Sequence, residues 1–261
     1  MLELNEAQQA AVCAPDGPGL VLAGAGSGKT RVIVERMAWL VEERGVDPRF
    51  LLALTFTNKA ANEMKERLAR RLGMDRLASF LGTFHSFGLY VLPREFVKLG
   101  RPKEFPIFVD ADQLSLMKRP VKVLGAGFEV VSPRAALSWI SRLKQSVDSP
   151  DWKAEPAYPA EASFRELWKR YHAALENASS LDFDDLLVLL VKLFEQDASV
   201  RERYQHRYRY VLIDEYQDTN RAQYLIARHL SDGHGNILAV GDEDQSIYSW
   251  RGADINNILD F

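Results

Sequence analysis

The segment that most constrains the fold of this chain is an apolar run, a glycine-rich turn and a helical pattern that follow one another directly. The run covers residues 20–23, and residues from about 29 to 43 have helical spacing. A second apolar run, residues 51–56, also leads into a helix, in which positions 61, 64, 68 and 72 place apolar side chains on one face. Continuous apolar strands alternating with helices predict a parallel sheet with helices on both faces.

The middle of the chain has a different character. From about residue 90 to 206 strand-like runs are scarce and helical patterns dominate, interrupted by a stretch with Pro and Ser at 146–163. Apolar strands return at residues 210–213 and 237–240. We therefore predict an α/β domain built from residues 1–89 and 207–261, with an inserted, mainly helical subdomain at residues 90–206.

Composition narrows the class of protein. Hydrophobic residues make up 47% of the chain, enough for a sizeable core, and this excludes disorder for the bulk of the chain. The net charge of −3 does not indicate a nucleic-acid binder, although a local basic groove would suffice for a single strand. Cys13 is the single cysteine, which excludes an internal disulfide and a cysteine zinc site. We expect no signal peptide, no membrane partner and a cytoplasmic location.

The glycine-rich turn has the composition of a phosphate-binding loop. In residues 23–30, AGAGSGKT, small residues let backbone N–H groups surround a phosphate at the start of a helix. Lys29 can reach the β- and γ-phosphates of a nucleotide, and the Thr30 hydroxyl can bind Mg²⁺. Ala23 stands where the usual pattern has its first glycine. The alternative is an ordinary turn with an incidental lysine.

A strand ending in two acids complements this loop. The apolar residues 210–213 lead directly into Asp214 and Glu215. A phosphate-binding loop requires a carboxylate from a neighbouring strand in the Mg²⁺ shell, which Asp214 would supply. Glu215 is placed to polarise an attacking water as a general base. Two solvated acids at a strand end are the alternative.

Several motifs, in order along the chain, resemble those of UvrD/Rep/PcrA-type superfamily 1 DNA helicases. They are LNEAQ at residues 4–8, TFTNKAA at 55–61, GTFHS at 82–86, LDFDDLL at 181–187, DEYQDTN at 214–220 and GDEDQSIYSWRGA at 241–253. Ser249 replaces the glycine that the family pattern has in the last of these. The resemblance implies a RecA-like P-loop NTPase lobe of α/β class.

The resemblance also implies roles in ATP and Mg²⁺ binding. Glu215, Lys29 and Gln245 would be catalytic, with Gln245 sensing the γ-phosphate. Thr30 and Asp214 would hold Mg²⁺. The nucleotide would be bound by Gln8, Ala23, Gly24, Ala25, Gly26, Ser27, Gly28, Lys29, Thr30 and Arg31.

DNA contacts are implied in the same way, because aromatic side chains stack on bases with little sequence preference. The partners would be single-stranded DNA and its junctions with duplex DNA. The residues concerned would be Phe56, Thr57, Asn58, Thr83, His85, Tyr248, Trp250 and Arg251.

Structural alternatives stay open for several of these residues. Gln8 could be an exposed helix residue, and His85 an ordinary core or surface histidine. Phe56 and one of Tyr248 and Trp250 could be core residues. Residues 201–209, RERYQHRYR, mix arginine and tyrosine as in a nucleic-acid-binding arm, but we favour a helix end with solvated arginines.

The family's engine has two RecA-like lobes, and this chain ends at Phe261, shortly after the last motif. We expect an N-terminal, ATP-binding portion of a 3′→5′ DNA helicase of repair or replication that cannot unwind DNA by itself. An alternative is a self-contained, non-hydrolytic module that binds DNA or a partner under ATP control, but it would have no use for a general base. A nucleotide kinase is a third interpretation, and it leaves the aromatic residues without a role.

Overall fold

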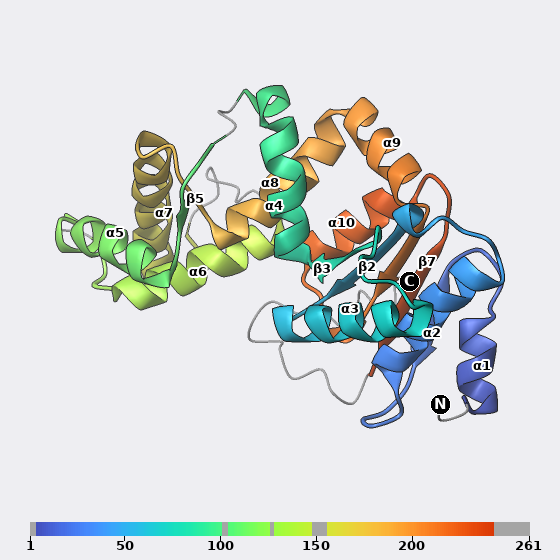
Figure 1. Cartoon of the computed structure of the whole chain (residues 1–261). Helices are drawn as coiled ribbons and strands as arrows, with labels where there is room; N and C mark the ends of the chain where they lie inside the picture. Colours follow the sequence, from blue (N-terminus) through green and yellow to red (C-terminus); the bar gives the residue numbers. More distant parts are fainter. Residues whose placement is uncertain (1–3, 101–103, 126–127, 148–155, 243–261) are drawn as a thin grey trace. The chain divides into compact units, whose positions relative to one another are not determined.

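The computed structural model describes residues 4–100, 104–125, 128–147 and 156–242, and they form two compact units (Figure 1). One unit combines Met1–Gly88 with Val191–Phe261, and the other is Leu89–Leu190. The chain passes between them within helices α4 (Phe84–Glu95) and α8 (Phe183–Gln196). Helix α9 (Ala198–Arg207) therefore falls in the first unit. The domain boundaries that we predicted from the sequence, 89/90 and 206/207, concern independently folding domains and stay a prediction.

The first unit contains a five-stranded parallel sheet with the order β1-β7-β6-β2-β3. Strands β6 and β7, which follow the second unit in the chain, lie together between β1 and β2, which precede it. This confirms the predicted mixed α/β fold with a parallel sheet. The strands are β1 (Gly19–Leu22), β2 (Leu51–Thr55), β3 (Phe80–Thr83), β6 (Tyr210–Ile213) and β7 (Ile237–Gly241).

Both faces of the sheet are covered. Leu51 and Ala53 pack with side chains of α2 and α3, while Leu52 and Leu54 point to the opposite face and are equally buried. The strands therefore read as continuous apolar runs rather than as alternating ones. The helices of this unit are α1 (Glu6–Val12), α2 (Lys29–Glu42), α3 (Asn58–Leu72), α9 and α10 (Arg221–Ser231), with short 3₁₀ turns η1 (Pro48–Phe50) and η3 (Tyr216–Asp218).

Local sequence explains where these helices begin and end. Asn5 caps α1 and forms a reciprocal capping box with Gln8, and the Thr57 hydroxyl accepts a hydrogen bond from Ala60 N at the start of α3. Gly73 ends α3 in the left-handed conformation, with φ of 61°. The predicted apolar face of α3 is confirmed, since Ala61, Met64 and Leu68 are buried.

The second unit is mainly helical, as predicted. Its core joins Met117, Ile140, Leu167, Tyr171 and Leu175 from three helices. A two-stranded parallel sheet accompanies them and was not predicted, because its strands are only two residues long. The elements are η2 (Phe96–Leu99), β4 (Ile107–Phe108), α5 (Asp110–Lys122), α6 (Pro133–Ser146), α7 (Pro159–Asn177) and β5 (Leu181–Asp182).

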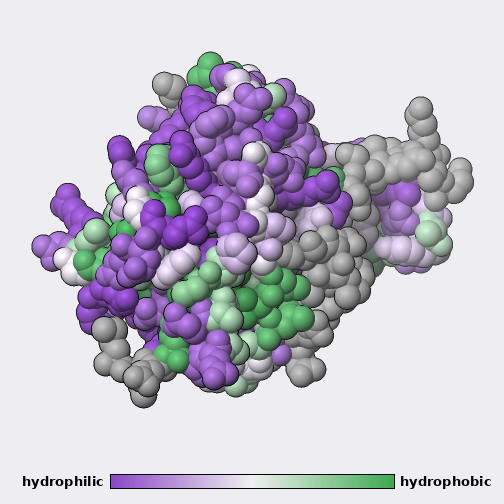
Figure 2. Space-filling model, turned by 90° about the vertical axis from the view of Figure 1, so that its right-hand side faces the viewer, coloured by the Kyte–Doolittle hydropathy of each residue, from purple (hydrophilic) through white to green (hydrophobic). Residues whose placement is uncertain are grey.

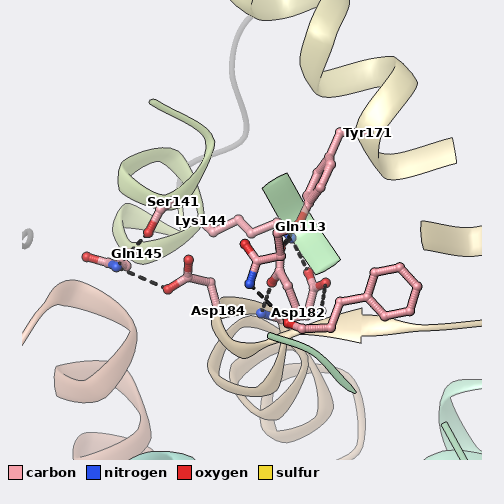
Figure 3. Close-up of polar contacts among 9 residues, drawn as sticks. Gln113, Ser141, Lys144, Gln145, Tyr171, Asp182 and Asp184 are labelled. Carbon is pink, nitrogen blue, oxygen red and sulfur yellow. Dashed lines mark hydrogen bonds and ion pairs between the residues drawn. The ribbon is translucent and has the colours of Figure 1, made fainter. Parts of the chain in front are cut away.

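A buried polar network fixes the end of this unit to its helices (Figure 3). Lys144 of α6 lies 2.7 Å from carboxylate oxygens of both Asp182 and Asp185. Tyr171 of α7 donates a hydrogen bond to Asp182, and Asp184 accepts one from Gln145. Burial raises the pKa of Asp184, whereas Lys144 helps to hold the pKa of Asp182 below its ordinary value against the opposing effect of burial. The segment 181–187 thus has an identifiable structural role.

The arginine- and tyrosine-rich segment 201–209 agrees with its interpretation as a helix end rather than as a nucleic-acid-binding arm. Tyr204 and Tyr208 are buried and pack edge-on against Phe87. Arg203 and Arg207 lie over the rings of these two tyrosines. The tyrosines are core residues and are not available for stacking on bases.

Hydrophilic residues predominate on the face shown in Figure 2, with smaller hydrophobic areas between them. Among the described residues, no helix has the length and apolar character needed to cross a membrane.

Candidate functional site

The predicted nucleotide residues gather at the carboxyl edge of the sheet. Because all five strands are parallel, their carboxyl ends lie at one edge, where ligands bind in open α/β sheets. β1 leads into the glycine-rich loop, β6 into Asp214 and β7 into Asp242. β2 and β3, the other two strands, deliver Phe56 and His85 to the same edge. The nucleotide candidates of the loop and of β6 therefore occupy one half of the edge, and the DNA candidates that follow β2 and β3 occupy the other.

The loop between β1 and α2 has the backbone of a phosphate cradle. Gly26 and Gly28 have φ angles of 72° and 87°, which favour glycine, and Gly28 immediately precedes α2. A Cβ added at Gly24 or Gly26 would meet no atom within 4 Å. The space beside these glycines is therefore open to a ligand, at the positive end of the α2 dipole.

Gln8 is in contact with this loop. Its Nε2 donates to the Ser27 carbonyl at 2.8 Å, and its Oε1 accepts from Asn5 N at 3.1 Å. A Cβ at Gly28 would lie 2.9 Å from the same Nε2. Gln8 is thus held by the α1 capping box and rests against the loop, rather than being an unattached surface residue.

Lys29 is buried and bound from two sides. Its ammonium donates to the Ala23 carbonyl and forms an ion pair with Asp242, both at 3.2 Å. Only 8% of the Lys29 side chain and 4% of the Asp242 side chain are exposed. The lysine therefore spans from the beginning of its own loop to the end of β7.

Thr30 and Asp214 are in direct contact. The Thr30 hydroxyl donates to Asp214 Oδ2 at 3.0 Å, which joins α2 to the end of β6. Burial, helped by the nearby Glu215, raises the pKa of Asp214 to about 6. A cation bound beside Asp214 would favour its charged form and lower this pKa again.

Glu215 is held in an unusual backbone conformation. Its φ of 51° lies in the left-handed region, where a non-glycine residue is strained. Its carboxylate accepts a hydrogen bond from Gln217 Nε2 at 2.8 Å, and Gln217 Oε1 accepts one from Asp242 N at 3.0 Å. Gln217 therefore connects the acid at the end of β6 to the backbone at the end of β7.

The charges of the site fit a divalent cation together with phosphates. Asp214, Glu215, Asp218 and Asp242 lie near one another, with Lys29 as their cationic neighbour. Asp218 Oδ1 is buried and has no hydrogen-bond partner among the described residues. Within that part of the chain, no cluster of three or more His, Cys, Asp or Glu side chains could hold a metal by itself. Mg²⁺ characteristically uses one or two carboxylates and completes its shell with water and phosphate oxygens.

The DNA candidates of β2 and β3 have mixed environments. Phe56 is half-buried, and Asn58 is exposed at the start of α3. Thr57 is exposed, but its hydroxyl caps the helix. Thr83 is 8% exposed and accepts a hydrogen bond from Ser86 N. Burial lowers the pKa of the half-buried His85.

Comparison with known proteins decides the family. Residues 4–261 match the model of the UvrD/REP helicase N-terminal domain. The chain belongs to this family. It is 44% identical over 261 residues to the ATP-dependent DNA helicase PcrA of Bacillus subtilis, covering 99% of the chain and 35% of that relative. PcrA proteins of Staphylococcus epidermidis and Staphylococcus aureus are 40% and 41% identical over 259 residues, again over 99% of the chain and 36% of the relative. The chain thus spans about a third of the length of these relatives.

Membership of the UvrD/REP family confirms the resemblance that the motifs suggested. The RecA-like character expected for the sheet-containing unit agrees with the matched domain and with the observed parallel sheet. Arg31 lies half-buried in the first turn of α2, beside the loop. Four predicted site residues, Gln245, Tyr248, Trp250 and Arg251, lie outside the described residues.

Two residues of this UvrD/REP-type site were given no role in the sequence-based prediction. Asp242 pairs with Lys29, and Gln217 links Glu215 to Asp242. Asp242 could have been found from the rule that identified Asp214, because it is also an acid directly after an apolar parallel strand. Gln217 could not, since its role depends on the turn at η3.

Proposed function

We propose that these 261 residues form the ATP–Mg²⁺-binding lobe of an ATP-dependent DNA helicase that translocates on single-stranded DNA with 3′→5′ polarity. The observation that carries the proposal is the joint geometry of the phosphate loop and the two strand-end acids, Asp214 and Asp242, around Lys29 and Thr30. The similarity to PcrA proteins, which are ATP-dependent DNA helicases, supports it.

In this proposal the loop residues bind the phosphates through backbone N–H groups, while Gln8 and Arg31 bind the base. Lys29 leaves Asp242 and contacts the β- and γ-phosphates. Thr30 and Asp214 hold Mg²⁺, which neutralises charge on the phosphate oxygens. Glu215 orients and deprotonates water as general base, and Gln245 senses the γ-phosphate. The strained backbone at Glu215 supports such a role, because strain of this kind concentrates at functional sites.

We propose that DNA is bound at the β2–β3 half of the edge by Phe56, Asn58, Thr83 and His85, with Thr57 positioning the start of α3. Tyr248, Trp250 and Arg251 complete the DNA contacts. The half-buried ring of Phe56 supports stacking on a base. In a protein of the relatives' length, this binding serves unwinding at junctions of single- and double-stranded DNA in repair or replication. The 261 residues by themselves bind without unwinding.

A titration with a fluorescent ATP analogue tests the nucleotide site. Lys29→Ala and Thr30→Val should each weaken Mg²⁺-dependent binding about tenfold or more, because each removes a charge-assisted or metal contact. Lys118→Ala, an exposed lysine of α5, is the matched control and should bind as the parent chain does. Equal binding by all four proteins would reject the proposal.

The hydrolytic and DNA-binding steps are tested separately. Glu215→Gln should abolish phosphate release while keeping nucleotide affinity, whereas a non-hydrolytic module would show no release in either protein. Phe56→Ala should weaken binding of a labelled dT oligomer roughly tenfold, because loss of one stacked base costs about 1–3 kcal/mol. Unchanged binding would remove Phe56 from the proposed DNA path.

A further inference from the structure

Helices α2 and α3 lie side by side (Figure 1). Side chains of both helices line a groove with a volume of about 410 Å³. The groove belongs entirely to the sheet-containing unit, and its lining includes Arg31, in the first turn of α2 directly after the phosphate loop. Four of its six lining residues are arginines. The lining residues are Arg31, Val34, Glu35, Arg67, Arg70 and Arg71.

The positive charge of this groove is local. The whole chain has a net charge of −3, but α3 carries five basic residues and only two acidic ones. Three of the five, Arg67, Arg70 and Arg71, lie in its last two turns and line the groove. A chain that is acidic overall therefore concentrates arginines at one place on its surface.

Two of these arginines are positioned by neighbouring carboxylates. Arg71 Nε lies 3.1 Å from Glu35, and its Nη1 lies 2.9 Å from Glu42. Arg67 is paired with Glu63, one turn earlier in α3. Arg70 is exposed and forms no ion pair with any other residue that the structure describes. A guanidinium has five donors, so Arg67 and Arg71 retain donors for a ligand.

We infer that the α2–α3 groove binds the phosphodiester backbone of a single-stranded nucleic acid. Arginine forks match phosphate oxygens in pairs, and Arg67 and Arg71 are one helical turn apart, about 6 Å along the axis. The inference rests on the proposed function, because the helix that begins with the DNA candidates Thr57 and Asn58 ends at this groove. Backbone contacts of this kind add affinity without sequence preference.

An acidic protein segment is the other polyanion that an arginine groove attracts. Peptide grooves usually anchor apolar side chains as well as charges. Here Val34 is the one apolar residue of the lining and is 4% exposed, so the remaining apolar surface comes from the aliphatic stems of the arginines and offers no pocket for an apolar anchor. The lining therefore favours a ligand that is recognised through its phosphates.

Salt-dependent binding of a labelled dT oligomer to the 261-residue chain tests the inference. Arg70→Ala should weaken binding at low salt and reduce the slope of log K against log salt by about 0.7, the value for one phosphate contact in a single strand. Arg67→Ala/Arg70→Ala should roughly double this change and weaken dT and mixed-sequence oligomers equally. Arg119→Ala is the matched control, because Arg119 is also an exposed arginine in the last turn of a helix.

Four outcomes would overturn the inference. One is a slope in the double variant equal to that of Arg119→Ala. A second is that the double variant loses binding to a labelled poly-glutamate peptide while its dT binding is unchanged, which would assign the groove to an acidic protein segment. The third is absence of dT binding by the parent chain. If Phe56→Ala weakens dT binding as expected but Arg70→Ala leaves it unchanged, the groove does not bind DNA and the proposed DNA path at β2 and β3 still holds. Nucleotide binding is measured independently of both variants.

Discussion

Lys29 and Asp242 form an ion pair, 3.2 Å long and almost completely buried, between the phosphate loop and the end of β7. The pair keeps the lysine charge satisfied without a nucleotide. Asp242 must therefore compete for the Lys29 ammonium with any phosphate that enters the loop.

Asp242→Asn should destabilise the nucleotide-free chain by about 3 kcal/mol, because removing one member of a buried pair leaves the other charge uncompensated. Urea unfolding followed by circular dichroism measures the change. Saturating ATP–Mg²⁺ should restore much of the loss, since the phosphates supply a new partner for Lys29. Asp232→Asn, which removes an exposed acid 3.8 Å from Arg228, should have no measurable effect. Equal stability of the two variants would contradict the assignment.

Two glycine substitutions should separate the stability of the loop from its function. Gly28→Ala should destabilise the chain by about 1–2 kcal/mol, because an L-residue is strained at φ of 87° and the new Cβ would displace Gln8. Gly24→Ala should leave the melting temperature unchanged, since its Cβ meets open space and its φ is not positive. It should nevertheless weaken ATP binding by filling the cradle. A fluorescent nucleotide titration beside a thermal melt checks both, and normal ATP binding by Gly24→Ala would show that phosphates lie elsewhere.

Lys144→Met should destabilise the helical unit by about 3–5 kcal/mol. The substitution keeps the length of the side chain but leaves Asp182 and Asp185 buried without their cation. Tryptophan fluorescence during urea unfolding reports on this unit through Trp139 and Trp168. Lys118→Met, on the exposed surface of α5, is the control and should unfold as the parent chain does. A loss below about 1 kcal/mol in Lys144→Met would mean that the carboxylates find other partners.

The pH dependence of the same unit should depend on Asp184. Burial raises the pKa of this acid above its ordinary value of 3.8, so the folded state binds its proton more tightly than the unfolded state does. Stability from this group is complete below the unfolded pKa and is lost as pH rises through the folded pKa. Asp184→Asn has no carboxylate to ionise, so the variant does not lose this stability as pH rises. The asparagine oxygen can still accept the hydrogen bond from Gln145.

We therefore expect Asp184→Asn to be at least as stable as the parent chain at pH 7, with its advantage shrinking as pH falls towards 4. Unfolding free energies measured across this range test the sign. Asp75→Asn, an exposed acid, should show no such trend. A variant that loses stability at pH 7 would indicate that the Asp184 charge is favourable, contrary to the direction stated here.

Much of the sheet was predictable because its strands are continuous apolar runs between helical patterns. Strands β2 and β6 were found within one residue of their observed ends, and α2 was predicted as residues 29–43 and is observed at Lys29–Glu42. Strand β3 was missed, since Phe80–Thr83 is short and contains Gly82 and a threonine. Its place in the sheet is fixed by pairing with β2, a long-range contact that local pattern does not show.

The candidate site was predictable where a motif encodes a contact within one segment, and less so where two strands meet. The loop glycines and the acids after β6 were identified from spacing. The pairing of Lys29 with Asp242 depends on β7 lying directly beside β1, an order that the sequence does not state. The Gln217 bridge likewise requires β6 and β7 to be neighbours.

That bridge has a thermodynamic consequence. One amide side chain contacts the carboxylate of Glu215 and the backbone N–H of Asp242, the partner of Lys29. A ligand that draws Lys29 away from Asp242 therefore changes the surroundings of Asp242. The backbone N–H of Asp242 is hydrogen-bonded to Gln217, and Gln217 also donates to Glu215. If occupancy of the loop alters the orientation of Glu215 through this amide, then the orientation of Glu215 must alter the affinity of the loop by the same free energy, because such coupling is reciprocal.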